Sequence, residues 1–353
     1  MNYNLSVIRD ECKTLSERIK IDELKNLTIL ITGANGLIGG FLSDFFCYIN
    51  DEYDANCTIY LTSYSLPSNV TRIKHLLNRS DVKYFSWDSS EQIKFSNLSG
   101  KIDKCFFCSG YGQPSKFLKN NVKTSMINVV GVESILNYMN SNLGGDFTFL
   151  STSEIYGNPP SDKIPTPETY GGEYELGNNR AAYKVSKCLG EVICKEYNKA
   201  DNMNVKIARV ALTYGPGVLW NDKRVLQEFI FKAADGDLKM LDGGESLRNY
   251  LYITDSVELI LNISKGKDLV YNVGGDSEEV SIYDLALKIA ENFNSKVIRG
   301  ESKIDATMSA PKGVCLDMTK VKSEFSFFGS KTTSLSDGIR QVIKWYNLGR
   351  NND

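Results

Sequence analysis

Tyr183 and Lys187 are the residues whose types and spacing most directly suggest chemistry. Residues four positions apart in a helix share one face, so the two side chains would point the same way. A lysine ammonium beside a phenol lowers the pKa of the phenol, and the resulting phenolate can act as a base near neutral pH. A solvated helix face would show the same spacing, so the pair alone leaves both interpretations open.

A second group of reactive side chains follows the apolar run Phe147 to Ser151, which reads as a buried strand. Thr152, Ser153 and Glu154 supply two hydroxyls and a carboxylate at its carboxyl end. Ligands of open α/β sheets bind at that edge, which favours a substrate site. Polar residues that only cap the strand would look similar.

A glycine-rich turn joins the β-branched run Leu27 to Thr32 to an apolar helical stretch from Leu37 to Tyr48. This context is typical of a dinucleotide site, in which the helix N-terminus faces the pyrophosphate. The first glycine permits the tight turn, the second lets the backbone approach the phosphates, and the third allows close packing. The turn reads Gly33-Ala34-Asn35-Gly36-Leu37-Ile38-Gly39.

The part of the predicted site that would hold the adenosine is less regular. An acidic residue usually ends the second strand and holds the ribose hydroxyls, but Thr62 and Ser63 stand there. They could bind an ordinary ribose, or accept a 2′-phosphate with Arg72 or Lys74 in reach, so NAD is expected and NADP stays possible. Asp88, at the end of the third strand, is placed for the adenine amino group or is a surface turn residue.

Strands and helices that alternate over about 180 residues are needed to position these side chains, and they predict an α/β, doubly wound parallel (Rossmann) sheet. Expected boundaries are an N-terminal helical extension over 1–26, a dinucleotide-binding domain over 27–212, and a smaller C-terminal α/β lobe over 213–353 that binds substrate. A segment near 249–256 is expected to return to the first domain. The expected strands and helices are 58–62, 70–77 (helix), 82–87, 104–108, 124–139 (helix), 147–151, 181–197 (helix), 205–210, 249–253 and 334–346 (helix).

The composition excludes several classes of protein. The 353 residues carry 41 basic and 43 acidic side chains, a net charge of -2, which argues against a dedicated nucleic-acid binder. One histidine, His75, nearly excludes a Ser-His-Asp triad or a histidine-rich metal site, and the 8 cysteines lack the paired spacing of a zinc site. We therefore expect no metal. Met1 to Lys20 is polar and no apolar stretch approaches a membrane span, so we expect a cytoplasmic protein with no membrane partner.

The motifs occur together in an order that resembles the extended short-chain dehydrogenase/reductases, the NAD-dependent epimerase/dehydratases acting on nucleotide sugars. The resemblance covers Leu27 to Tyr346. It includes the glycine turn, the strand-end Ser/Thr, Tyr183-x-x-x-Lys187, Tyr214-Gly215-Pro216, Arg248-Asn249-Tyr250-Leu251-Tyr252-Ile253-x-Asp255 and Tyr271-Asn272-Val273-Gly274-Gly275.

The resemblance implies an enzyme that transiently oxidises the sugar at C4. Tyr183 would take the proton of the O4 hydroxyl, Thr152 would share that hydrogen bond, and Lys187 would tune Tyr183 and hold the nicotinamide ribose. The 4-keto sugar acidifies C5 and activates a C5 carboxylate for loss. Glu154 would be the second acid–base group.

Local residues point to one branch of the family. Two stretches are similar to those of UDP-glucuronate decarboxylases: Thr152-Ser153-Glu154 and the residues from Tyr214 to Val225. The first stretch is also similar to that of GDP-mannose 4,6-dehydratases. Arg224 and Arg248 would bind the nucleotide diphosphate, and Ser153 is also expected to bind the substrate. Two departures indicate a rebuilt pocket: Leu212 replaces an asparagine, and the loop from Ser109 to Pro114, which flanks the nicotinamide, replaces an alanine-rich one.

Decarboxylase or dehydratase activity on a nucleotide sugar with retained NAD is therefore the leading hypothesis. A 4-epimerase or an NADPH-dependent 4-ketoreductase is the alternative within enzymes, and a dinucleotide-sensing binding protein is the alternative outside them. By resemblance we also expect a homodimer formed through the helix that holds Tyr183 and its neighbour.

Overall fold

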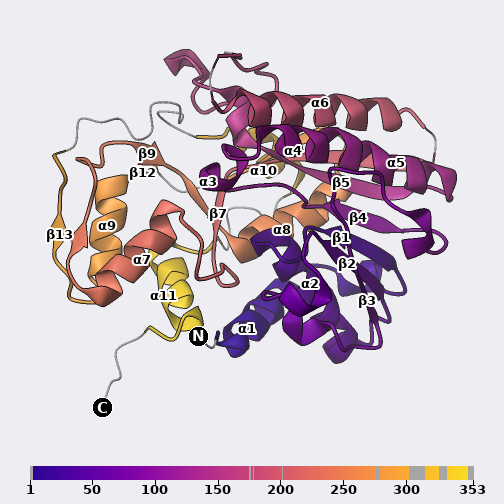
Figure 1. Ribbon diagram of the computed structural model, residues 1–353, viewed down its shortest axis with the longest axis horizontal. Coiled ribbons are helices and arrows are strands. Elements are labelled where there is room, and N and C mark those ends of the chain that lie inside the picture. Colours follow the sequence, from indigo (N-terminus) through magenta and orange to yellow (C-terminus); the bar gives the residue numbers. More distant parts are fainter. Residues whose placement is uncertain are drawn as a thin grey trace.

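The computed structural model describes residues 3–174, 176–177, 179–200, 202–275, 279–301, 315–325 and 332–348. At its centre is a seven-stranded parallel sheet in the order β11-β6-β5-β4-β1-β2-β3 (Figure 1). The predicted doubly wound sheet is confirmed. Its strands are β1 (Thr28–Thr32), β2 (Thr58–Ser63), β3 (Val82–Ser86), β4 (Lys104–Phe107), β5 (Gly145–Thr152), β6 (Met203–Val210) and β11 (Val270–Val273).

Helices cover both faces of this sheet, because the parallel strands are apolar on both sides. One face carries a layer of three helices, and the other carries two helices with the N-terminal helix packed outside them (Figure 1). The first layer is α4 (Asn121–Met126), α5 (Val132–Ser141) and α6 (Ala181–Tyr197). The second is α2 (Leu37–Tyr53) and α8 (Ile253–Asn262), with α1 (Leu5–Ser16) against both.

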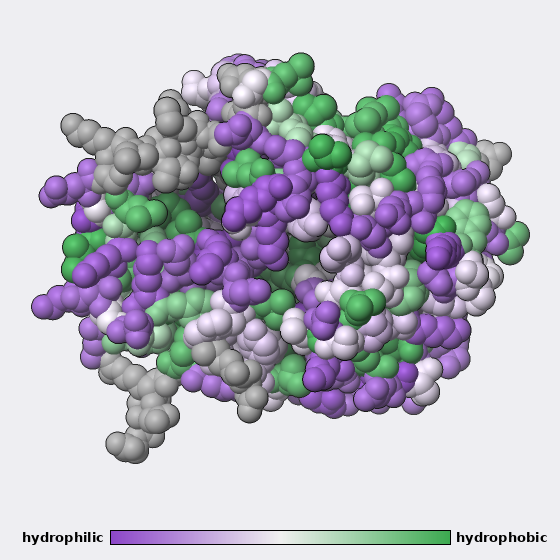
Figure 2. Space-filling view, viewed as in Figure 1, coloured by the Kyte–Doolittle hydropathy of each residue, from purple (hydrophilic) through white to green (hydrophobic). Residues whose placement is uncertain are grey.

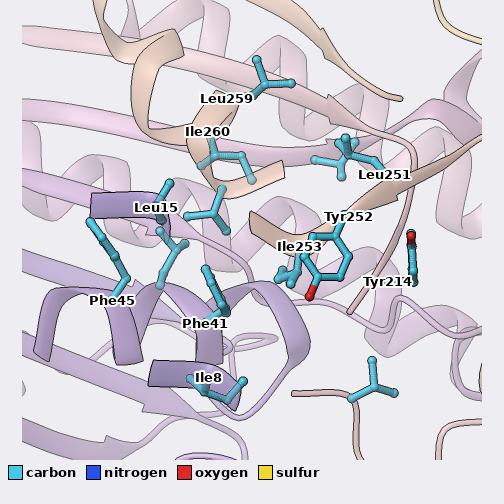
Figure 3. Packing of buried hydrophobic residues seen from close by; sticks show 14 of the residues in the cluster. Ile8, Leu15, Phe41, Phe45, Tyr214, Leu251, Tyr252, Ile253, Leu259 and Ile260 are labelled. Carbon is cyan, nitrogen blue, oxygen red and sulfur yellow. The ribbon is translucent and has the colours of Figure 1, made fainter. Parts of the chain in front are cut away.

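The core lies between these layers and the sheet. Figure 3 shows Ile8 and Leu15 of α1 beside Phe41 and Phe45 of α2, all within one buried apolar cluster. The N-terminal extension is thus part of the core, and its helix is shorter than the predicted stretch from Met1 to Lys25.

The smaller lobe follows β7 (Leu212–Tyr214). α7 packs on α9, and short strands pair around them. The elements of the lobe are α7 (Val225–Asp235), β8 (Leu238–Lys239), β9 (Leu247–Arg248), β12 (Val280–Ser281), α9 (Ile282–Ala290) and β13 (Val297–Ile298). Later in the chain, α10 (Thr319–Glu324) packs on the strand β11 of the central sheet, and α11 (Leu335–Trp345) contacts both α1 and α9.

The chain crosses back to the first domain before the lobe is complete. β10 (Tyr250–Tyr252) pairs in parallel with β7, α8 covers the central sheet, and β11 joins the sheet beside β6. The part of the chain that returns to the first domain therefore extends to Val273, beyond the segment near 249–256 that the sequence indicated. The predicted division into domains remains a prediction.

One predicted helix is wrong. The segment 70–77 contains only a short 3₁₀ turn, Lys74–Leu76. The backbone N–H groups of Thr71 and Arg72 donate to Asn35 Oδ1, at 3.2 and 2.8 Å, and so tie the segment to the glycine turn. Val70, Ile73 and Leu76 are buried in the core, so their helix-like spacing reflects packing of an irregular segment.

Within the described residues, no helix is long and apolar enough to cross a membrane. The same residues contain no group of three or more His, Cys, Asp or Glu side chains that could hold a metal ion. The eight cysteines are free thiols, and Cys105 is fully buried, which raises the pKa of its thiol.

Candidate active site

A cleft of about 780 Å³ lies between the carboxyl ends of the central strands and the smaller lobe, and Figure 2 shows the hollow on this face. It combines the glycine turn, the loop after β4, the end of β5, one face of α6 and a loop of the lobe. Most of the predicted site residues line it: Gly33, Asn35, Gly36, Leu37, Ile38, Gly39, Ser109, Thr152, Ser153, Glu154, Tyr183, Lys187, Arg224 and Arg248.

The glycine turn has the geometry that a dinucleotide requires. Gly33 has φ +64°, and a Cβ there would lie 2.6 Å from the carbonyl oxygen of Cys108. A Cβ on Gly39 would lie 2.6 Å from the Gly33 carbonyl oxygen. Gly36 caps α2, so the helix N-terminus opens onto the cleft. These residues fit a bound dinucleotide.

Tyr183 is buried on α6, and its environment acts against ionisation of the phenol. Burial raises its pKa, and the charge of Glu154 raises it further, whereas a hydrogen bond with Thr152 and the Arg180 guanidinium lower it. Phe117, in α3 (Pro114–Phe117), stacks on the phenol ring with centroids 4.5 Å apart and planes 4° apart. Tyr183 and Thr152 are therefore brought together as expected.

Lys187 lies one turn further along α6 and is buried. Its Nζ donates to the Leu150 carbonyl oxygen at 2.7 Å and lies 4.5 Å from the centre of the Phe149 ring. Burial lowers the pKa of the ammonium to about 8. The influence of this lysine on the Tyr183 phenol stays a prediction.

Glu154 is bound by a residue that the sequence reasoning missed. Arg180 Nε donates to Glu154 Oε2 at 2.9 Å, and its terminal nitrogen donates to the other oxygen. The guanidinium also lies over the Phe117 ring, 5.0 Å from its centre. Arg180 stands three residues before Tyr183, one helical turn away, and this spacing is the signal that could have revealed it.

The other polar residues of the cleft have internal partners. The Ser109 backbone N–H donates to Thr32 Oγ1 at 3.1 Å, which fixes the loop after β4 against β1. Arg224 is paired with Asp222, its Nε and a terminal nitrogen lying 3.0 and 2.8 Å from the carboxylate oxygens. Arg248 is partly buried, and burial lowers the pKa of its guanidinium.

Three predicted cofactor residues, Thr62, Ser63 and Asp88, lie at the ends of β2 and β3 and are not among the described residues that line the cleft. Thr62 Oγ1 is buried without a hydrogen-bond partner in the described part of the chain. Ser63 shares a hydrogen bond of 2.8 Å with Tyr84. Burial acts to raise the pKa of Asp88, but the hydrogen bonds from Lys123 and Ser90 and the charge of Lys123 together outweigh burial, and the pKa is lowered.

Arg72 does not fit the role of a 2′-phosphate ligand. It is 2% exposed, and its guanidinium pairs with Asp44. His75, the single histidine, lies 2.6 Å from the other oxygen of Asp44. This cluster ties the segment after β2 to α2.

The model of the NAD dependent epimerase/dehydratase family matches residues 29–274, which include the glycine turn, Thr152, Tyr183 and Lys187. The chain belongs to this family. It is therefore an enzyme of a class that depends on NAD, and the geometry of the glycine turn fits this dinucleotide.

The individual relatives share about a quarter of their aligned residues with the chain. The chain is 27% identical over 299 residues to UDP-glucuronic acid decarboxylase 5 of Arabidopsis thaliana, covering 84% of this chain and 83% of the relative. It is 26% identical over 329 residues to UDP-glucuronic acid decarboxylase 1 of Xenopus tropicalis, covering 92% and 73%.

Two solved structures share the fold. The UDP-glucuronic acid 4-epimerase of Bacillus cereus, in complex with UDP-glucuronic acid and NAD, aligns with a TM-score of 0.73 and 21% identity, covering 91% of this chain and 99% of that one. An epimerase of Methanothermobacter thermautotrophicus aligns with a TM-score of 0.74 and 18% identity, covering 98% and 96%.

Proposed function

We propose that this enzyme decarboxylates a nucleotide uronic acid, with UDP-glucuronate as the leading substrate, through transient oxidation at C4. The observation that carries the proposal is the presence of Thr152, Glu154 and Tyr183 in one cleft beside the glycine turn. The similarity to UDP-glucuronic acid decarboxylases supports the choice of substrate.

In the proposed reaction, Tyr183 takes the proton of the sugar O4 hydroxyl. Thr152, which hydrogen-bonds Tyr183, orients that hydroxyl. The glycine turn and Lys187 would hold NAD, which would supply the hydride acceptor for the oxidation at C4 and the hydride donor for its reversal. Because burial disfavours the phenolate, the tyrosine needs nearby positive charge. Arg180, the N-cap residue of α6, and Lys187, one turn after Tyr183, are proposed to supply it.

Glu154 is the group that separates this proposal from simple epimerisation. Oxidation at C4 makes loss of the C5 carboxylate possible, and a second acid–base group must then handle a proton at C5. The two-point contact with Arg180 holds the Glu154 carboxylate in one orientation beside Tyr183.

Arg224 and Arg248 are proposed to bind the diphosphate of the substrate, because guanidinium groups match phosphate oxygens geometrically. Both line the cleft on the side of the smaller lobe. The substrate diphosphate would have to compete with Asp222 for Arg224.

Mass spectrometry of products from UDP-glucuronate, GDP-mannose and dTDP-glucose tests the proposal. We expect loss of carbon dioxide from UDP-glucuronate without added cofactor. Loss of water from another sugar would indicate a dehydratase, and an unchanged mass with altered stereochemistry an epimerase. Consumption of added NADPH with net reduction of a 4-keto sugar would indicate the ketoreductase alternative. Each of these results would overturn decarboxylation.

We also propose a homodimer formed through α4 and α6. The two helices pack side by side (Figure 1). They leave apolar side chains exposed to solvent. The apolar surface that they form comprises Val122, Met126, Val185, Leu189 and Val192. Contiguous exposed apolar side chains of this kind favour an interface.

A further inference from the structure

Tyr3, which precedes α1, contacts a loop that lines one side of the cleft. We call residues 217–225 the substrate loop. Its inner side lines the cleft with Leu219, Asn221, Lys223 and Arg224. Its outer side contacts the N-terminal segment and α11.

Tyr3 makes the most direct of these outer contacts. The backbone N–H of Trp220, in the middle of the substrate loop, donates to the Tyr3 hydroxyl at 2.9 Å. The Tyr3 ring stacks on Trp345 of α11, with centroids 4.6 Å apart and planes 10° apart. The Trp345 indole N–H in turn donates to the Val218 carbonyl oxygen at 2.9 Å. Tyr3 and Trp345 thus hold two neighbouring backbone groups of the loop.

The support for Tyr3 is itself fixed to the rest of the molecule. The Asn4 backbone N–H donates to the Trp345 carbonyl oxygen at 3.0 Å. Within α1, the buried Glu11 accepts hydrogen bonds from Tyr252 and Thr254, at 2.8 and 2.5 Å. Arg18, just beyond the helix, pairs with Asp255 at 2.7 Å. Together with the apolar contacts to α2 in Figure 3, these bonds anchor the segment that carries Tyr3.

We propose that Tyr3 is a positioning residue for substrate binding, which presets the substrate loop to receive the nucleoside diphosphate. The inference rests on the proposed function, in which Arg224 binds that diphosphate. Ordering a loop costs conformational entropy when a ligand binds, and a loop that is already held in place avoids part of that cost. NAD would be held by the glycine turn and not by the substrate loop, so we expect its affinity to be unchanged when Tyr3 is altered.

Two variants separate positioning from general stability. Tyr3→Phe keeps the ring that stacks on Trp345 but removes the acceptor of the Trp220 N–H. Asn4→Ala removes the side-chain cap of α1, where Asn4 Oδ1 accepts from the Ser6 N–H, and leaves the contacts of Tyr3 in place. Both are compared with the full-length, NAD-loaded wild type.

The first measurement is amide hydrogen exchange of peptides covering residues 215–224. We expect faster exchange in Tyr3→Phe and wild-type exchange in Asn4→Ala. The second is calorimetric titration with UDP, GDP and dTDP. Tyr3→Phe should weaken binding of the preferred nucleotide by about three- to tenfold, the size of one lost hydrogen bond, with NAD affinity unchanged. Asn4→Ala should lower thermal stability only.

Wild-type exchange of the loop in Tyr3→Phe would overturn the inference, whichever nucleotide the enzyme binds. Equal weakening of UDP and NAD binding would overturn it as well, because it would show a general structural effect. Failure of the wild type to bind UDP, with tight binding of GDP or dTDP, would instead contradict the proposed substrate, and the comparison of variants would continue with that nucleotide.

Discussion

At the scale of single residues, the charge around Tyr183 controls whether the proposed base can ionise. Burial and the Glu154 carboxylate raise the pKa of the phenol, and Arg180 opposes them. Arg180 therefore has two effects: it orients Glu154 and it offsets the Glu154 charge beside the base.

Replacing Arg180 tests this arrangement. Arg180→Gln leaves Glu154 without its guanidinium, so we expect the pKa of Tyr183 to rise and kcat at neutral pH to fall by about ten- to a hundredfold, one to two pKa units. The rate should also recover toward higher pH. Arg180→Lys, which keeps the positive charge, should retain more activity near neutral pH. A pH–rate profile of the glutamine variant that matches the wild type would contradict this account.

The buried Lys187 predicts a dependence of stability on pH. Its pKa is about 8 in the folded chain and returns to the ordinary value of 10.5 on unfolding. Between these values the unfolded chain binds more protons, so this residue favours folding increasingly as the pH rises through about 8. Below about 8 the lysine is charged in both states, and its burial cost is present in full.

Urea unfolding of the cofactor-free wild type and of Lys187→Met measures this effect. The unfolding free energy of the wild type minus that of the variant should increase between about pH 7.5 and about pH 9.5. Comparison with the variant cancels the other titrating groups. A difference that does not change over this range would show that Lys187 keeps an ordinary pKa.

At the scale of elements, hydrophobic pattern and turn chemistry predict the parts that the backbone itself determines. Helix α6 begins and ends where the sequence placed it, Ala181–Tyr197, because its apolar spacing is regular. The helix predicted over 124–139 is interrupted by a π-helical turn, Ile127–Gly131. The segment 70–77 is not an α-helix: its buried residues Val70, Ile73 and Leu76 pack on the core from an irregular backbone, which Asn35, distant in sequence, ties to the glycine turn.

The residues of the candidate site also fall into those that the sequence pattern predicts and those that it does not. Motif spacing predicts the glycine turn, Thr152 and the Tyr183–Lys187 pair, because each lies within one strand–turn–helix unit. Phe117 depends on a contact between elements, which spacing alone does not reveal, whereas the position of Arg180 one helical turn before Tyr183 is visible in the sequence.

The glycine turn gives a test at this scale. Gly33→Ala places a Cβ 2.6 Å from the Cys108 carbonyl oxygen and strains a residue at φ +64°. We expect loss of NAD binding and a decrease in unfolding free energy of at least about 1 kcal/mol. Gly171→Ala is the matched control, since its Cβ would meet nothing within 4 Å and the residue is not among the described residues that line the cleft. NAD titration and urea unfolding distinguish the two, and equal NAD affinity would contradict the assignment of the turn.

At the scale of the whole molecule, the apolar surface of α4 and α6 predicts the oligomeric state. Leu189 is 46% exposed in the single chain, so Leu189→Glu should leave the fold intact and place a charge in the proposed interface. Light scattering after gel filtration should show a dimer for the wild type and a monomer for the variant. Leu143→Glu, at an exposed leucine outside these helices, is the control. A monomeric wild type would rule out this interface.

The central claim concerns the whole cycle: C4 is oxidised, carbon dioxide is lost, and the same hydride returns. UDP-glucuronate deuterated at C4 tests it most directly, with the enzyme as purified and no added cofactor. The account predicts a UDP-pentose that has lost carbon dioxide and retains deuterium at C4, and no product from Tyr183→Phe with NAD still bound. A product of unchanged mass, or a decarboxylated product formed by Tyr183→Phe at the wild-type rate, would contradict it.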